Sequence, residues 1–473
     1  MSLRNGLWLA GVFLVAGCDL FNPYEQPQTE TPPAFTEQPP TNLMAAGWPD
    51  PHWWENFHSD TLTQLETQAA QHNFDIAAAV ARVHQADAQV RVSGAALLPS
   101  LEADAGASRD YAHSGSTGTG TGATVGGGSR TVYNANLAAA YELDFWGHNR
   151  SLLEEAQAQR DASRYDQQVV ALTVSASVAD LYFDMLALNE RLAVAQDNIT
   201  NAKKTLDALN KRFKQGLISR LDVAQQENVV AQQNASIAPL QLSLSQDRDA
   251  MAVLLGQLPE KTDIASGKVE NIVVPPVSGG LPSELLQRRP DVAEAEADLV
   301  AAHADINAAR ADFFPTIDLT ASGGYQSAAL GSLFNSQGQF LSLGASLAQP
   351  IFEGGLLTGE LELSKGKYEE LEQNYRKSIV AAFADVEDGL AGWQRNTEQM
   401  NAQAESVRTA KEAYALSQRQ FEGGTVDITS VLDTQRALFS AQDAYLQARD
   451  AQLQSAVTLY KVLGGGWQKP AAS

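Results

Sequence analysis

An internal repeat constrains the fold of this chain more than any other feature of its sequence. HQADAQVRVSGAALLPSLEADAGA at 84–107 parallels VAAHADINAARADFFPTIDLTASGG at 300–324, and their prolines lie 216 residues apart. RFKQGLISRLDVAQQ at 212–226 parallels RQFEGGTVDITSVLDTQ at 419–435, and the glycines at 216 and 424 lie 208 residues apart. The first copy is therefore about eight residues longer, and the excess lies near the Gly/Ser/Thr stretch 114–129. One structural unit used twice should adopt the same fold in both copies.

Each copy has the order helix, proline, strand, loop, strand, helix, turn, helix. We expect the first copy to occupy 59–280, with a helix, strands at 101–113 and 131–145, a long helix at 148–215, a helix at 221–256 and an equatorial segment at 257–280. We expect the second copy to occupy 281–467, with a helix at 291–313, strands at 317–330 and 339–351, a long helix at 355–421 and a helix at 428–463. Residues 468–473 form a C-terminal tail.

The four expected strands alternate between apolar and polar side chains, which is typical of a sheet with one apolar and one polar face. The even-numbered polar positions include six acids: Glu102, Asp104, Asp110, Glu142, Asp144 and Asp318. None of their even-numbered neighbours in the expected strands is basic. At about 3.3 Å per residue the longer strands can cross a bilayer. The alternative is an ordinary soluble sheet with one hydrated face.

Residues 148–215 contain neither proline nor glycine and can form a helix about 100 Å long. Apolar residues recur there at spacings of four and three, from Tyr165 to Leu186 and, after a slip in phase, from Leu188 to Phe213. The second copy repeats the pattern 208 residues later. Such heptads predict coiled-coil packing. A cytosolic or fibrous coiled coil is the alternative, and the alternating strands argue against it.

Composition restricts the class of protein further. A formal charge of −23 argues against nucleic acid as a partner, because nucleic acids select basic surfaces. We expect no transmembrane helix in the mature chain, so a membrane crossing would use strands. Four strands cannot close a barrel, and an open sheet edge is forbidden in lipid. Three chains sharing twelve strands would satisfy both conditions.

The sequence also argues against an enzyme or a metalloprotein. The motifs G-x-S-x-G, H-E-x-x-H and G-x-x-x-x-G-K-[ST] are all missing from it. Seven histidines, scattered along the chain, and a single cysteine supply a metal site poorly. We therefore expect no metal, no cofactor and no catalytic residue.

The N-terminus has the pattern of a secretory signal. Arg4 precedes an apolar run of about ten residues and the stretch LVAGC, which ends at Cys18. We expect a signal peptide at 1–17 and a proline-rich N-terminal segment at 18–58, whose WWENF at 53–57 begins the ordered structure. Leu14 to Cys18 resemble the bacterial lipobox, which implies cleavage before Cys18 and acylation of its sulfur. An ordinary signal peptide is the alternative, and Asp19 leaves the sorting of a lipoprotein open.

Together these features resemble the TolC-like outer-membrane efflux proteins, in their OprM-like lipoprotein branch. The stretches that carry the resemblance are QRRPDVAEAEADLVAAHADINAARADFFPTIDL, LAQPIFEGG, SVLDTQRALFSAQDAYLQAR and LYKVLGGGW. The resemblance implies a mainly α-helical chain with four strands and long coiled-coil helices. It also implies a homotrimer whose twelve-stranded β-barrel lies in outer-membrane lipid and continues into an α-helical periplasmic tunnel. A periplasmic adaptor and an inner-membrane pump of RND, MFS or ABC type would be its partners.

The resemblance also implies roles for particular residues. Gly216 and Gly424 match turn glycines where adaptor tips dock, at the closed periplasmic end. Asp433 matches an aspartate that faces the constriction, and Arg436 matches a basic neighbour. Thr429 stands where the OprM-like pattern has an apolar gate residue, and Ser430 replaces a second aspartate of the TolC-like pattern. For Asp433 the alternative is a solvated acid on a helix surface.

The function implied is a passive exit duct for drugs or other small molecules. The alternatives are a type I protein-secretion duct and a structural coiled-coil lipoprotein of the envelope. On the first interpretation the six strand acids face the lumen. They would then favour cations or simply keep the bore hydrated.

Overall fold

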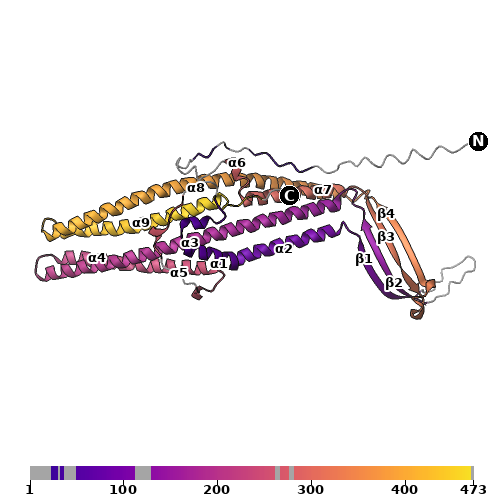
Figure 1. Cartoon of the computed structure of the whole chain (residues 1–473), viewed down its shortest axis with the longest axis horizontal. Helices are drawn as coiled ribbons and strands as arrows, with labels where there is room; N and C mark the ends of the chain where they lie inside the picture. Colours follow the sequence, from indigo (N-terminus) through magenta and orange to yellow (C-terminus); the bar gives the residue numbers. More distant parts are fainter. Residues whose placement is uncertain are drawn as a thin grey trace, which may run out of the picture. The chain divides into compact units, whose positions relative to one another are not determined.

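A computed structural model describes residues 23–29, 32, 34–36, 49–111, 129–261, 267–275 and 282–469 (Figure 1). Cys18, Asp19, the signal peptide and nearly all of the stretch 114–129 lie outside the described residues. The chain forms two compact units. The first combines residues 1–27, 84–161 and 297–373, and the second combines 28–83, 162–296 and 374–473. Each is described by itself.

The first unit contains a four-stranded antiparallel sheet of β1 (Ser100–Tyr111), β2 (Ser129–Glu142), β3 (Thr316–Ser327) and β4 (Gln339–Ala348). The strands follow one another in the order β1-β2-β3-β4, and two short 3-10 helices, η4 (Leu330–Ser332) and η5 (Ser336–Gly338), connect β3 to β4. The edge strands β1 and β4 are exposed along their whole length. Leu101 and Leu341 are more than 70 % exposed, so an apolar face lies uncovered in a single chain.

Proline and aromatic residues form the junction between helices and strands in this unit. α2 (Phe74–Ala95) and α7 (Pro290–Ala311) end shortly before Pro99 and Pro315, which suit the extended backbone that enters β1 and β3. The indole of Trp146 stacks on Phe314 with ring centroids 4.9 Å apart, and its Nε1 donates to the Pro315 carbonyl at 2.7 Å. His148 lies 2.8 Å from the Asp312 carboxylate. These contacts join the end of β2 in the first copy to the start of β3 in the second.

The second unit is built around long helices. α3 (His148–Lys214) and α8 (Leu356–Glu422) are both 67 residues long, as expected for equivalent helices of two copies, and both begin in the first unit. α9 (Ile428–Val462) is a single helix. Three short helices, η2 (Pro259–Lys261), η3 (Val269–Asn271) and α6 (Pro282–Leu285), lie in the connection between the copies.

The expectation of one helix at 221–256 was wrong. The chain forms α4 (Arg220–Ala235) and α5 (Ile237–Leu254), with Ser236 between them. The reason is Pro239, which has no N–H to donate to the carbonyl of Ala235 and whose ring would clash with that carbonyl. The single helix α9 of the second copy has no proline at all, so the two copies differ here.

The expectation that no later helix is long and apolar enough to cross a membrane was also wrong, because α3 meets both conditions. α3 contains an 18-residue window with a mean hydropathy of 1.5. A core helix passes the same test, and α3 supplies Phe183 to the interior of its unit, where its ring lies 5.0 Å from that of Phe57.

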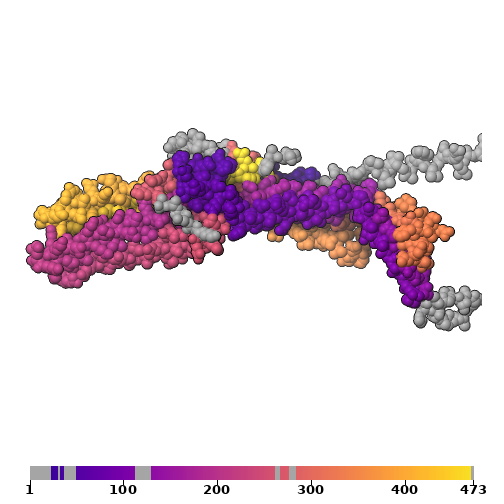
Figure 2. Space-filling model, turned by 60° about the horizontal axis from the view of Figure 1, so that its bottom comes forward, coloured from indigo at the N-terminus to yellow at the C-terminus, as the bar shows by residue number. Residues whose placement is uncertain are grey.

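The aromatic start of the ordered chain is part of that core, as predicted. η1 (Trp53–Phe57) buries Trp53 and Phe57 completely, and Trp53 stacks on Tyr460 of α9 at 5.2 Å. The following helix, α1 (Asp60–His72), is capped by the Ser59 side chain. Figure 2 shows the indigo surface of this N-terminal region beside the yellow surface of the C-terminal end.

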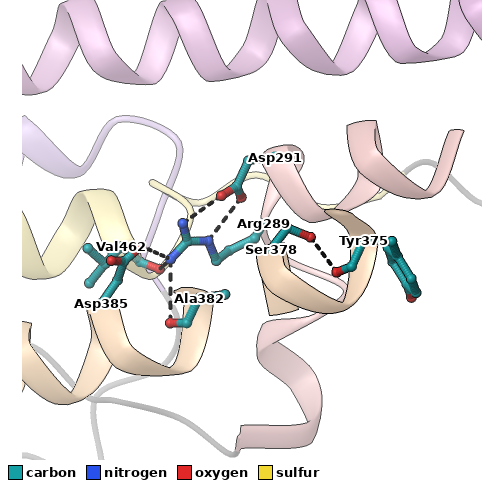
Figure 3. A network of polar contacts seen from close by, with 7 residues as sticks. All are labelled: Arg289, Asp291, Tyr375, Ser378, Ala382, Asp385 and Val462. Carbon is teal, nitrogen blue, oxygen red and sulfur yellow. Dashed lines mark hydrogen bonds and ion pairs between the residues drawn. The ribbon is translucent and has the colours of Figure 1, made fainter. Parts of the chain in front are cut away.

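The end of α9 meets the start of the second copy in a region that we call the clasp, formed by Arg289 and Gly464–Gly466. Arg289 is 11 % exposed and pairs with Asp291 at 2.6 Å and with Asp385 at 2.9 Å (Figure 3). Its Nη1 also donates to the carbonyls of Ala382 and Val462, the second of which ends α9. One guanidinium thus ties α7, α8 and α9 together.

The three glycines of the clasp all have positive φ. A Cβ at Gly464 would meet the Arg288 carbonyl, and one at Gly466 would meet the backbone of Asp50 and Pro51. The GGG stretch is therefore where three segments of backbone cross at close range, which only glycine allows.

Candidate functional site

The two helical hairpins, α3–α4 and α8–α9, reverse through equivalent turns that we call the tips (residues 212–219 and 420–427). At the first tip Gly216 has φ +73°, and Leu217 N–H donates to the Arg212 carbonyl at 3.0 Å. At the second, Gly424 has φ +71°, and Thr425 N–H donates to the Gln420 carbonyl at 2.9 Å. Both are Schellman-type helix ends that require the left-handed conformation glycine favours.

A capping side chain starts the return helix at each tip. Ser219 and Asp222 form a capping box at α4. Asp427 accepts the Ser430 N–H at 3.0 Å and caps α9, and this backbone hydrogen bond lowers the pKa of the Asp427 carboxyl. Nothing lies within 4 Å of a Cβ placed at either glycine, so both tips are open on their outer side.

The two tips pack against each other through a small apolar cluster. Its buried members come from both hairpins: Leu209, Val223, Ile428, Val431 and Leu432. Above it the Arg212 guanidinium lies 4.3 Å from the centroid of the Phe421 ring, a cation–π contact between the hairpins. A few apolar side chains therefore hold this end of the unit together.

Behind the cluster lies a ladder of buried polar groups that the sequence analysis did not find. Gln226 donates to the Ala202 carbonyl at 2.8 Å and to Gln435 Oε1 at 3.3 Å. Gln435 and Gln418 both donate to the Tyr414 hydroxyl, at 3.0 and 2.7 Å. Gln226 and Gln435 are fully buried, and burial raises the pKa of Tyr414. The only sequence signal was that both glutamines stand at inward positions of their helices.

Three predicted gate residues share one exposed stripe of α9. Thr429, Asp433 and Arg436 are spaced by four and three residues, so they follow one face of the helix. Arg436 Nη1 lies 3.0 Å from Asp433 Oδ1. The side chains are 42 % and 63 % exposed, respectively, so in a single chain this is a solvated ion pair.

The sheet register places the even-numbered strand residues on one face. Glu102 lies opposite Ala138, Asp104 opposite Asn136, and Glu142 opposite Asp318. Directly paired residues in an antiparallel sheet point to the same side. Five of the six predicted acids therefore share this face: Glu102, Asp104, Asp110, Glu142 and Asp318.

Two details of that face differ from expectation. β2 ends at Glu142, and Asp144 lies beyond the strand. Its side chain, 9 % exposed, accepts the N–H groups of Asn149 and Arg150 and pairs with the Arg150 guanidinium at 3.1 Å. Asp144 therefore caps α3, because the first amides of a helix attract a carboxylate.

The second difference concerns Arg130. β2 begins at Ser129, two residues earlier than expected, and Arg130 lies directly opposite Asp110. The acidic face thus includes one basic residue near the loop end of the sheet. The purely acidic face expected from the shorter strand was wrong.

A group of acids in the helical unit was also missed. Asp180 and Asp184 of α3, Asp247 of α5 and Asp450 of α9 lie close enough to influence one another. Burial and the neighbouring aspartates raise the pKa of Asp450 to about 7 and that of Asp247 to about 6. Among the described residues no set of three or more His, Cys, Asp or Glu has the arrangement of a metal site.

Comparison with known proteins identifies the family. The profile of the family described as "Outer membrane efflux protein" matches residues 65–257 and 281–465. The pyoverdine export outer membrane protein OpmQ of Pseudomonas putida is 38% identical over 446 residues, which cover 93% of this chain and 94% of that protein. The toluene efflux pump outer membrane protein TtgC of Pseudomonas putida is 34% identical over 462 residues, covering 96% and 94%.

Solved structures agree. The open state of the MtrE outer membrane channel of Neisseria gonorrhoeae superposes with a TM-score of 0.85 at 30% identity, over 96% of this chain and 99% of that chain. The outer-membrane channel OprN gives a TM-score of 0.84 at 26% identity, over 93% and 99%. The chain belongs to the outer membrane efflux protein family, which confirms the resemblance seen in the sequence. It is an outer-membrane efflux channel that extends into the periplasm.

Proposed function

We propose that three copies of this chain form one passive exit duct. The observation that carries the proposal is the sheet, whose two edge strands are fully exposed and whose odd-numbered face bears uncovered leucines. Pairing β1 of one copy with β4 of the next would satisfy both edges and, with three copies, close a twelve-stranded barrel. The apolar face would then meet lipid and the acidic face would line the bore.

The tips would form the periplasmic end of the duct and would receive the adaptor. Gly216 and Gly424 hold equivalent turns with open outer sides, which leaves room for a docking hairpin. The inner-membrane pump, of RND, MFS or ABC type, would supply the substrate through that adaptor. Relatives named for pyoverdine, toluene and antibiotics favour small molecules over secreted proteins as the cargo.

Closure would involve the stripe Thr429, Asp433 and Arg436. Three copies of Asp433 in a narrow ring would repel one another unless each has a basic neighbour. Arg436 lies one turn away at 3.0 Å and provides it. An adaptor that competes for the tips could separate these contacts, whereas Val431 and Leu432 remain in the apolar cluster.

Planar-bilayer recording of the detergent-purified trimer tests the proposal. We expect channels in the wild type, higher resting conductance in Asp433→Ala and Arg436→Ala, and unchanged assembly. Glu227→Ala, which removes the acid of the exposed Arg220–Glu227 pair of α4, serves as a matched control. A stable monomer without conductance would contradict the duct. Wild-type conductance in both α9 variants would remove the pair from the gate and leave closure to the apolar cluster.

The lipid anchor is proposed separately, because Cys18 lies outside the described residues. Cys18→Ser should abolish incorporation of labelled fatty acid. Export should persist in part, since the barrel provides its own insertion energy. Label retained in the variant would show that the lipobox interpretation is wrong.

A further inference from the structure

A large cavity lies in the second unit, away from the tips. Its volume is about 840 Å³, and its wall comes from the chain at 49–54, α1, α3, the segment before α7, and the clasp glycines with Trp467. Backbone at Pro51 and Gly466 closes one side, where a Cβ on the glycine would meet the neighbouring chain. A hollow with such close backbone walls is largely preformed, as ligand pockets usually are.

One carboxylic acid on this wall has no evident structural role. Glu66 of α1 is 3 % exposed, and within the described residues its Oε1 is buried without a hydrogen-bond partner. Burial raises the pKa of Glu66 to about 8, while the neighbouring Ser175 hydroxyl opposes the shift. An acid so placed is largely protonated at neutral pH, and a bound cation would favour its ionised form.

The other groups on the wall are suited to an apolar cation. Indole rings of Trp53, Trp54 and Trp467 line the cavity, and tryptophan is the aromatic residue that attracts cations most strongly. The remaining charged side chains on the wall are Asp50 and Arg288, and Arg288 already has an interaction of its own. The protein thus offers an aromatic, mostly apolar hollow with a buried acid.

We propose that this cavity binds a small organic ammonium compound with an apolar body, whose ammonium group pairs with the Glu66 carboxylate. The body lies against the indole rings, and the ammonium donates to the Glu66 carboxylate. Binding releases the Glu66 proton to solvent. The O–H bond of the Glu66 carboxyl breaks, and the resulting carboxylate forms an ion pair with the ammonium group. This site is independent of the bore and of the tips.

Calorimetric titration of the full-length protein in detergent with benzylamine at pH 7 tests the proposal. We expect saturable binding with release of about one proton, seen as heat that depends on the ionisation enthalpy of the buffer. Affinity should rise about tenfold per pH unit from pH 6 to 7. It should level off above pH 8, because Glu66 is then already deprotonated in the free protein. Benzyl alcohol, the neutral analogue, should bind at least tenfold more weakly.

Two variants separate the ion pair from simple apolar binding. Glu66→Gln keeps the size of the side chain and should lose at least tenfold in affinity together with the proton release. Asp60→Asn removes an exposed acid from the same helix and should bind like the wild type. Undiminished affinity in Glu66→Gln, equal binding of benzyl alcohol, or absence of binding by the wild type would each overturn the proposal. If Glu66→Gln does not fold, the pH profile and proton release of the wild type decide alone.

Discussion

The tips and the clasp are built in opposite ways, although both lie in the helical unit and both depend on glycines with positive φ. At the tips the glycines face open space, the ion pair on α9 is half exposed, and a handful of apolar residues provides the packing. At the clasp the glycines meet backbone, and the central arginine is 11 % exposed with two acidic partners. A solvated ion pair contributes little, whereas breaking a buried one is costly.

The difference indicates which region can move. Rearranging the tips exposes few apolar side chains and breaks contacts that water can replace. Rearranging the clasp would leave Asp291 and Asp385 without their cation and separate three closely packed backbones. We therefore interpret the clasp as the fixed part of the helical unit and the tips as the part that opens.

The largest effect is expected from Gly464→Ala. The new Cβ would meet the Arg288 carbonyl, and the residue has φ +86°, so both sterics and backbone conformation oppose the change. We expect loss of the assembled trimer, measured by size-exclusion chromatography. Gly392→Ala on α8, where nothing lies within 4 Å of the new Cβ, is the control and should assemble normally. Normal assembly of both variants would mean that the backbone of the clasp accommodates the added Cβ at little cost.

The second largest effect is expected from Arg289→Met. It leaves the carboxylates of Asp291 and Asp385 without their shared partner and should lower the free energy of unfolding by about 3 kcal/mol, the lower end for a buried pair, because both acids are partly exposed. Thermal unfolding of the trimer measures this. Arg408→Met on α8 also removes an arginine with two acidic partners, but these pairs are fully exposed, and the variant should unfold like the wild type. Similar losses of unfolding free energy in the two variants would show that burial does not explain the difference between these ion pairs.

The two regions should also respond to pH with opposite signs. Near the clasp, the pKa of Glu66 is raised to about 8, so the folded state retains a proton that the unfolded chain loses above about 4.5. Stability should therefore fall as pH rises from 4.5 to 8, by about 3 kcal/mol at pH 7. Asp427 at the second tip has a lowered pKa, so its contribution is present at neutral pH and is lost on acidification. Chemical unfolding across this range should show a shallower decline in Glu66→Gln, and an unchanged profile would contradict the burial argument.

The smallest effect is expected at the tips. Gly216→Ala and Gly424→Ala place a Cβ in open space but at φ of +73° and +71°, which costs about 1 kcal/mol each. Gly423→Ala, beside the second turn and with φ outside the left-handed region, is the control and should cost less. Denaturant unfolding compares the three. A loss at the tips as large as that of Gly464→Ala would erase the contrast between the regions.

Much of this architecture follows from the sequence alone. Period-two alternation predicted the strands, heptad spacing in two runs predicted the long helices, and paired glycines predicted the two tips, because each pattern depends on neighbours within a few residues. The helix break before Pro239 was equally local and could have been found there. Terminal positions were less certain: an error of two residues at the start of β2 hid Arg130, and one of three residues at its end misplaced Asp144.

Only the tertiary structure decided which distant groups meet. Arg289 reaches Asp385 and Val462 across 96 and 173 residues, and Gln226 reaches Gln435 across 209. Glu66 stands in an amphipathic helix like any surface acid, and only the packing of α1 and α3 shows that it is buried. Local periodicity records which face of an element turns inward. The partner that this face meets, and hence the charge state of a group on it, depends on how separate elements pack, which periodicity does not encode.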